Sequence, residues 1–249
     1  MKLFIALVFS AVNVFAGITY DFHSDTTGLQ QMVLAGAVAA EGPNMKMTIA
    51  SGDGMMFKSG SIVLSRDGGK TLSIFDPATK TYYEMPLQEM LGGAADMLKN
   101  SAMKVSFGNP LVTVQEAGDG GKIEGFPTRK MLVDASVDIN IDAMGQKMNS
   151  RLSMHSESWT TDRIDPNAAN IFQQQGVRTG IEALDKLIEG QAAAFKGRFP
   201  LKQVSTVHIT QNGRDLATTT TATVTTSGRS RSTWRRSPRR RDTRGGSRP

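Results

Sequence analysis

Hydrophobic and polar residues alternate at the spacing of short β-strands between Ser61 and Pro86. Apolar or aromatic residues cluster in runs of strand length at 61–65, 70–75 and 81–85. Asp67-Gly68-Gly69 supplies residues that adopt the positive φ angles of a tight turn, and Asp76-Pro77 starts a second turn with a preset φ. The stretch therefore predicts an antiparallel meander of three strands, around which we expect the rest of the chain to be organised.

Two strand patterns and a hairpin precede this meander. Residues 18–23 alternate apolar and polar, so Ile18, Tyr20 and Phe22 share one face of a strand. The segments 33–40 and 45–50 flank the turn formers of 41–44, which predicts a hairpin. A helix from Leu29 to Ala40 is the alternative, because Ala is a good helix former.

Two segments have the period of a helix. Pro86 suits a first helical position, and the apolar residues after it recur three and four apart: Leu87, Met90, Leu91, Ala94 and Leu98. This pattern predicts an amphipathic helix over 87–99, which Gly92-Gly93 weakens. The second helix is predicted over 181–195, with Thr179 and Glu182 as a capping box and Gly197 as its C-terminal left-handed residue.

The remaining patterns are those of strands. They lie at 104–107, 111–115, 121–124, 128–133, 137–141, 150–160, 202–210 and 216–226. Asp119-Gly120 and Asn212-Gly213 are typical of hairpins. Polar residues alternate with Val137, Ile139 and Ile141, so we expect one face of the sheet to be exposed to solvent. We therefore expect an α+β fold, mainly β, with an antiparallel sheet over 17–226.

The first 16 residues predict export. Lys2 precedes an apolar run from Leu3 to Val12, and Val14-Phe15-Ala16 precedes Gly17, which is the order of a secretory signal cleaved after Ala16. The apolar run is too short to cross a bilayer, which takes about 20 residues. The chain has no Cys, so we expect neither a disulfide nor a lipid-modified N-terminus. We expect a periplasmic protein with no transmembrane segment in the mature chain.

The charge is divided between two regions. The whole chain carries +6, but residues 227–249 hold nine of its 29 basic residues and one of its 23 acidic residues. With Lys2 also set aside, 17–226 keep 19 basic and 22 acidic residues, a net charge of −3. The basic character therefore belongs to the tail, and we expect no nucleic acid to bind the folded part.

Residues 227–249 predict a disordered Arg-rich tail, because they contain one large apolar residue, Trp234. Such a tail would bind anionic lipid or nucleic acid by counterion release. The alternative is a frameshift, because Arg241 to Gly245 can be encoded so that the next frame reads Glu-Ile-Pro-Ala-Gly.

Few residues are candidates for chemistry. The chain contains no nucleophile elbow, Walker loop, zincin helix or paired-Cys metal site. His23, His155 and His208 lie in separate strand patterns without a spaced partner. We therefore expect no enzyme, no cofactor and no metal. Met is abundant, with 14 residues, and Met45 and Met47 share a strand face, where they either bind Cu(I) or fill an adaptable apolar core.

A family resemblance rests on several motifs together. These are the signal peptide, Met45-Lys46-Met47, the segment 72–86 with Phe75-Asp76-Pro77 and Tyr82 to Pro86, and Gly125 to Arg129. Over 17–226 the chain resembles an uncharacterised family of exported bacterial proteins, which is similar to the periplasmic lipoprotein-carrier superfamily typified by LolA. The resemblance implies a strongly curved antiparallel sheet, an unclosed half-barrel whose concave face is covered by helices. The family's closing segment, of the Glu-Ile-Pro-Ala-Gly type, is absent here.

Three classes of function follow. The first is a monomeric, non-enzymatic carrier that binds an apolar ligand, such as a lipid or lipoprotein acyl chain, under the helices. The residues expected on that surface are Met45, Met47, Leu72, Ile74, Tyr82, Met85, Met90 and Leu91. The alternatives are an envelope stress or assembly factor that binds protein partners, and periplasmic copper binding through Met.

Overall fold

The fold is built on one antiparallel sheet. The structure, a computed structural model, describes residues 17–29, 31–52, 57–90, 92, 103–143, 145–169, 178–211 and 213–226. The twelve strands are β1 (Ile18–Gly28), β2 (Met32–Glu41), β3 (Asn44–Ser51), β4 (Ile62–Ser65), β5 (Thr71–Asp76), β6 (Thr81–Pro86), β7 (Met103–Phe107), β8 (Leu111–Ile123), β9 (Phe126–Ala143), β10 (Gln146–Thr161), β11 (Phe199–Gln211) and β12 (Arg214–Thr226).

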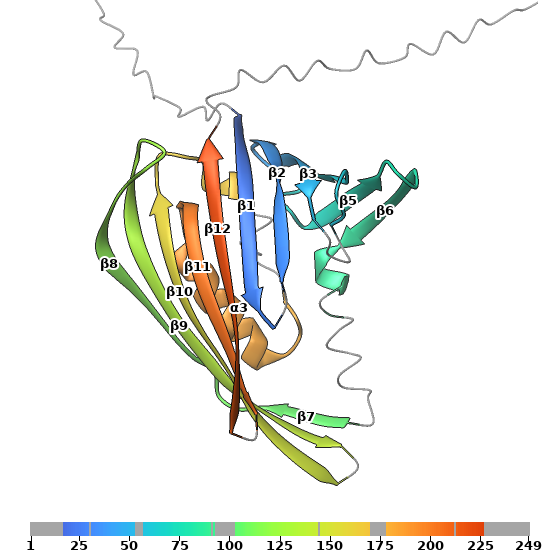
Figure 1. Cartoon of the computed structure of the whole chain (residues 1–249), viewed down its shortest axis with the longest axis vertical. Helices are drawn as coiled ribbons and strands as arrows, with labels where there is room; N and C mark the ends of the chain where they lie inside the picture. Colours follow the sequence, from blue (N-terminus) through green and yellow to red (C-terminus); the bar gives the residue numbers. More distant parts are fainter. Residues whose placement is uncertain are drawn as a thin grey trace, which may run out of the picture.

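The sheet is open at both ends. Its order is β6-β5-β4-β3-β2-β1-β12-β11-β10-β9, and β9 then pairs with β8 along one part of its edge and with β7 along the other. Every pairing is antiparallel, and the first and last strands, β1 and β12, are neighbours (Figure 1). The expected mainly β fold, with an antiparallel sheet that does not close, is confirmed.

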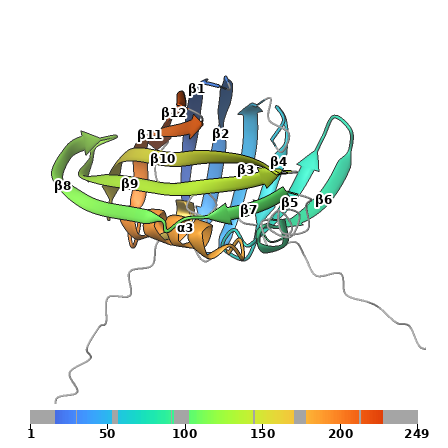
Figure 2. The ribbon, with the colours of Figure 1, turned by 90° about the horizontal axis from the view of Figure 1, so that it is seen from below.

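Helices lie inside the curve of this sheet, as Figure 2 shows. The helix α3 (Glu182–Ala194) packs on β8 and β9, and the short helix η1 (Pro166–Ala169) lies against β11. Residues 87–90 and Gly92 are also helical, while the rest of the helix predicted over 87–99 lies outside the described residues. The concave face is therefore covered by helical segments, as the resemblance implies.

The register of the strands assigns each side chain to a face. Met131 and Val133 of β9 pack against Ala194 and Phe195 at the end of α3, so they lie on the concave face. Residues directly opposite one another in paired strands share a face, and side chains alternate along each strand. The residues paired with Met131 and Val133, and every second residue from them, are therefore concave as well.

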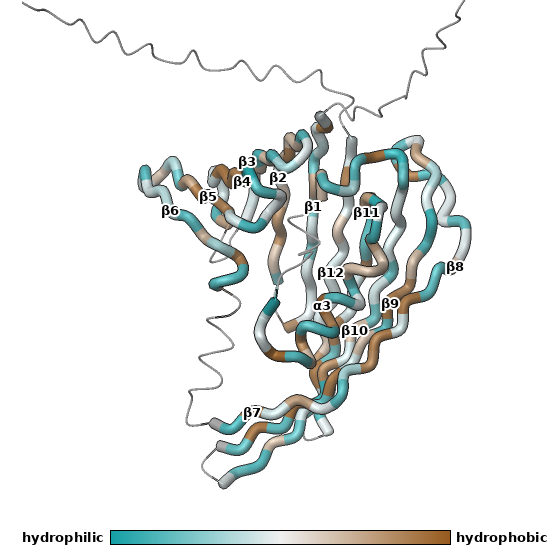
Figure 3. The backbone as a smooth tube through the Cα atoms, turned by 180° about the vertical axis from the view of Figure 1, so that it is seen from behind, coloured by the Kyte–Doolittle hydropathy of each residue, from teal (hydrophilic) through white to brown (hydrophobic). Residues whose placement is uncertain are grey.

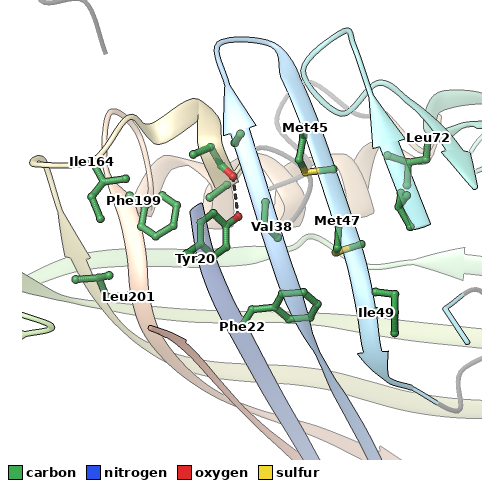
Figure 4. Packing of buried hydrophobic residues seen from close by; sticks show 14 of the residues in the cluster. Tyr20, Phe22, Val38, Met45, Met47, Ile49, Leu72, Ile164, Phe199 and Leu201 are labelled. Atoms are coloured by element: carbon green, nitrogen blue, oxygen red, sulfur yellow. Dashed lines mark hydrogen bonds between the residues drawn. The ribbon is translucent and has the colours of Figure 1, made fainter. Parts of the chain in front are cut away.

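Tyr20 joins the sheet to the segment that covers it. Its side chain is 1% exposed, and its hydroxyl donates a 2.8 Å hydrogen bond to the carbonyl oxygen of Ala168 in η1 (Figure 4). The ring meets Phe199 of β11 edge to face, with centroids 5.2 Å apart. Tyr20 thus holds a distant segment on the concave face and satisfies a buried carbonyl there.

Gly190 allows α3 to approach β8 closely. A Cβ at this position would collide with the side chain of Val112, whose own Cβ would lie 2.9 Å away. Gly weakens a helix interior by about 1 kcal/mol relative to Ala. The residue is therefore explained by packing, because a side chain at position 190 would push the helix off the sheet.

Most predicted strands are confirmed, including β2, which is a strand and not a helix. The hairpin predicted at Asp119-Gly120 is wrong. Residues 111–123 form one strand, β8, with register shifts after Glu116 and after Asp119, and the hairpin to β9 turns at Glu124-Gly125, both with positive φ. Asp119 and Gly120 form an irregularity within β8 and no turn, because β9 pairs with β8 on both sides of them.

The predicted capping box is also wrong. α3 begins at Glu182, whose carboxylate binds Lys186, while Asp185 accepts hydrogen bonds from the backbone and hydroxyl of Thr179. Burial acts to raise the pKa of Asp185, but the hydrogen bonds from Thr179 and Gly180 and the charge of Arg178 together outweigh it, so the pKa lies below its ordinary value. The left-handed residue expected at Gly197 is confirmed, with φ of 70°.

We predict that Tyr20→Phe lowers the free energy of unfolding by about 1–2 kcal/mol, because it leaves the Ala168 carbonyl buried without its partner. Urea denaturation measures this change. Tyr82→Phe is the matched control, because the Tyr82 hydroxyl binds Glu84 at the surface, and it should change stability by less than about 0.5 kcal/mol. Equal effects of the two substitutions would contradict the anchoring role.

Tyr20 should also make stability fall at alkaline pH. Burial raises the pKa of Tyr20 above its ordinary value, so the folded chain keeps a proton that the unfolded chain loses above about pH 10. The stabilisation is complete below that pH and is lost as pH rises further. Denaturation curves between neutral and strongly alkaline pH should show a smaller loss in Tyr20→Phe than in Tyr82→Phe.

A third prediction concerns Gly190. We expect Gly190→Ala to lower stability by about 1 kcal/mol or more, because the collision with Val112 outweighs the gain in helix propensity. Gly92→Ala is the matched control, since none of the described residues has an atom within 4 Å of the added methyl group in that helical position. If both variants were equally stable in thermal melts, close packing of α3 would not explain Gly190.

Candidate functional site

Four of the eight ligand-binding residues expected from the sequence lie in the packed core. Met45, Met47, Leu72 and Ile74 lie on the concave face of β3 and β5 and are at most 9% exposed. They pack in one cluster with Tyr20, whose neighbours Figure 4 shows. Because these four side chains are already enclosed by protein, they form packed core and no open ligand surface.

The other four expected residues lie elsewhere. Met85 and Met90 are partly buried at the border of the same cluster, and Leu91 lies outside the described residues. Tyr82 is 59% exposed and pairs with Phe75, one residue out of step with Ile74. It therefore lies on the convex face, and its placement beside Leu72 and Ile74 on the ligand surface is corrected.

A second apolar surface lies at the other end of the concave face, beside the hairpin between β9 and β10. Three rows of paired residues form it: Val105, Ile141 and Met148; Phe107 and Ile139; and Leu152, Ile209 and Leu216. Val207 continues it on β11, opposite Met154. We call these nine residues the distal apolar face, and Figure 3 shows hydrophobic positions along β7 and β9 there.

The distal apolar face is only partly covered. Ile209 is 36% exposed and Leu216 is 42% exposed, and the other seven members are half-buried. A hollow of about 330 Å³ adjoins it, where Val105 and Phe107 of β7 face Ile181 and Ala183 at the start of α3. The apolar surface is thus continuous with a recess of the size that small-molecule sites have.

The sequence contained part of the signal for this surface. The alternation at Val137, Ile139 and Ile141 marked one apolar face of β9. The sequence did not predict which end of the concave face would stay partly exposed, because the residues that cover the other end, such as Ala168 and Phe195, come from distant segments.

A row of hydroxyl groups separates the distal apolar face from the core. Ser156, Ser205, Thr220 and Thr26 are consecutive partners across β10, β11, β12 and β1. The Oγ atoms of Ser156 and Ser205 are 2.8 Å apart, and the Oγ1 atoms of Thr220 and Thr26 are 3.0 Å apart, so each pair shares a hydrogen bond. We call these four residues, together with Ser158, the hydroxyl belt. It places a row of hydrogen-bonding groups between the packed core and the distal apolar face.

The histidines lie on the convex face. His155 is 2.7 Å from Asp134, and His208 is 2.9 Å from Asp215, across neighbouring strands around a hollow of about 390 Å³. His23 is exposed on β1. Within the described ranges, no cluster of three or more His, Asp or Glu residues could hold a metal ion. The two pairs are ordinary cross-strand hydrogen-bonded pairs at an exposed surface.

No protein-family model matches this chain, and no curated protein matches it. Among solved structures, a LolA superfamily protein from Nitrosomonas europaea matches with 9% sequence identity and a TM-score of 0.28, covering 84% of each chain. That likeness concerns the fold alone.

No helix among the described residues has both the length and the apolar character needed to cross a membrane.

Proposed function

We propose that this protein is a non-enzymatic carrier that binds a lipid or lipoprotein acyl chain on the distal apolar face. The observation that supports it most is an apolar surface across β7, β9, β10, β11 and β12 that includes exposed Ile209 and Leu216, adjoins a recess and is interrupted by the row of Ser150, Gln211 and Arg214. Apolar patches of this kind commonly mark ligand or partner sites, because covering them removes apolar area from water.

The length and curvature of the surface suit an extended chain. From Met148 to Ser156 the strand β10 advances by eight residue steps, which is about 27 Å at roughly 3.4 Å per residue. The apolar rows therefore form a long path between the β9–β10 hairpin and the hydroxyl belt. The sheet is open, so a chain could leave by the same side from which it arrived, as a carrier requires.

A binder is favoured over an enzyme by where the polar groups lie. The two His–Asp pairs are on the convex face, opposite the apolar surface, and in the described part of the chain the hydroxyl belt is hydrogen-bonded to other hydroxyls and to Gln203, with no His, Asp or Glu to activate a nucleophile. The copper hypothesis loses its favoured residues, because Met45 and Met47 fill the packed core. A monomer that needs no cofactor remains part of the proposal.

Protein binding at the edge of the sheet is a second candidate. β6 is an edge strand, and its Tyr82 and Tyr83 are 59% and 43% exposed. Edge strands can accept a further strand from a partner. A crosslinker at Tyr83 that captured one stoichiometric protein, with no lipid co-purifying, would favour this function over a carrier.

The carrier proposal predicts different effects of two adjacent substitutions in β12. Leu216→Asp should weaken binding of palmitate at least tenfold, because it places a charge on the distal apolar face. Ala217→Asp, on the convex face and also exposed, should leave binding unchanged. Calorimetric titration measures both, and circular dichroism checks that both fold. Equal affinities would contradict the site.

The same titration should show a dependence on chain length. From octanoate to palmitate, each added methylene group should raise the affinity by up to about fourfold, since a buried methylene contributes about 0.8 kcal/mol. An affinity that did not change with chain length would mean that the alkyl chain remains in water.

We further propose that the carrier works in the periplasm after removal of residues 1–16. The charged, apolar and small-residue order of that segment and the lack of Cys support this location. Mass spectrometry of protein from the periplasmic fraction should find Gly17 as the first residue. Recovery only of the full-length chain from the cytoplasm would overturn the proposed location.

A further inference from the structure

The hydroxyl group of Ser158 is buried without a hydrogen-bond partner. The residue is 0% exposed, and its Oγ makes no hydrogen bond within the described part of the chain. A buried hydroxyl without a partner costs stability, and such groups are uncommon in folded proteins. Because Ser158 pairs with Gln203, it lies on the concave face at the inner end of the hydroxyl belt.

The rest of the belt also has spare donors. When two hydroxyls share one hydrogen bond, one O–H group is used and the other remains free to donate. This applies to the pair Ser156–Ser205 and to the pair Thr26–Thr220. Gln203 uses its amide group to donate to Ser156 and Ser205, at 3.0 and 3.1 Å, so it adds donors to the belt. The belt therefore keeps O–H groups, on Ser158 and on one member of each hydroxyl pair, that its own hydrogen bonds do not use.

The belt borders the surface proposed for the acyl chain. Ser156 and Met154 are successive concave residues of β10, about 7 Å apart, and Ser205 and Val207 have the same relation on β11. Ser205, Thr220 and Gln203 are half-buried, whereas Ser156, Ser158 and Thr26 are buried, so a ligand would reach the belt first at Ser205 and Thr220. A ligand whose alkyl chain covers the distal apolar face would place its polar linkage at these hydroxyls.

We propose that the hydroxyl belt binds the carbonyl oxygens of an acyl linkage, so that the ligand is an ester-linked or amide-linked acyl lipid and not a plain hydrocarbon or an ether lipid. This inference rests on the proposed function. A carbonyl oxygen is an acceptor with two lone pairs and carries no charge, which matches a row of neutral donors without a Lys or Arg among them.

Two probes test the inference: palmitoyl lysophosphocholine, and its hexadecyl ether analogue, which lacks the carbonyl. The wild-type protein should bind the ester about fivefold more tightly than the ether. Thr220→Val and Ser158→Ala should remove this preference by weakening ester binding alone. Thr219→Val is the matched control, because Thr219 makes a similar 3.1 Å hydrogen bond with Thr206 on the convex face, and it should keep the preference.

Ser158→Ala adds a readout that a merely structural residue would not give. The melting temperature of the free variant should rise, because the unpartnered hydroxyl is removed, while its affinity for the ester falls. Equal binding of ester and ether by the wild type would overturn this inference alone. Binding of neither lipid would overturn the proposed function and this inference with it. A Ser158→Ala variant with unchanged ester affinity would remove Ser158 from the site.

Discussion

The hydrogen bond from Tyr20 to Ala168 is the contact on which the concave face most depends. A sheet that does not close into a barrel must cover its inner face with segments from elsewhere in the chain, since apolar side chains exposed on that face would weaken the fold. Tyr20 lies on the first strand, whereas Ala168 follows the tenth, and Phe199 begins the eleventh. One side chain thus joins three parts of the chain that are far apart in sequence.

The concave face has two ends that differ in burial: one is an enclosed core, and the other keeps partly exposed apolar side chains. At the end of the sheet where β1 begins and β12 ends, η1 and the core residues around Met47 exclude water and supply the packing. α3 covers the middle of the long strands, where Gly190 lets it lie directly on Val112. Beyond α3 the apolar rows of β9 to β12 continue without an equal cover, as the exposure of Leu216 shows. The curvature of one sheet thus encloses a core at one end and leaves apolar side chains partly exposed at the other.

Much of the sheet could be predicted from the sequence, because alternation identifies strands and tight turns identify hairpins. The hairpin at Glu124-Gly125 was missed because Glu seldom adopts positive φ, whereas Asp119-Gly120 is a favoured turn that here became a strand irregularity. The candidate site was harder to predict from the sequence. Met47 and Ile139 have similar patterns, and only the tertiary structure determines that a distant segment covers the first and leaves the second half-buried.

The hydroxyl belt shows where the requirements of folding and binding differ. A concave floor made only of apolar residues would be simpler to pack, and the unpartnered Ser158 lowers the stability of the free chain. Such local departures from good packing tend to lie at functional sites, because a ligand can complete what the fold leaves open. The belt stands where the enclosed core gives way to the distal apolar face, so a molecule that completed it would be held at its polar linkage while its alkyl chain lay on the open rows.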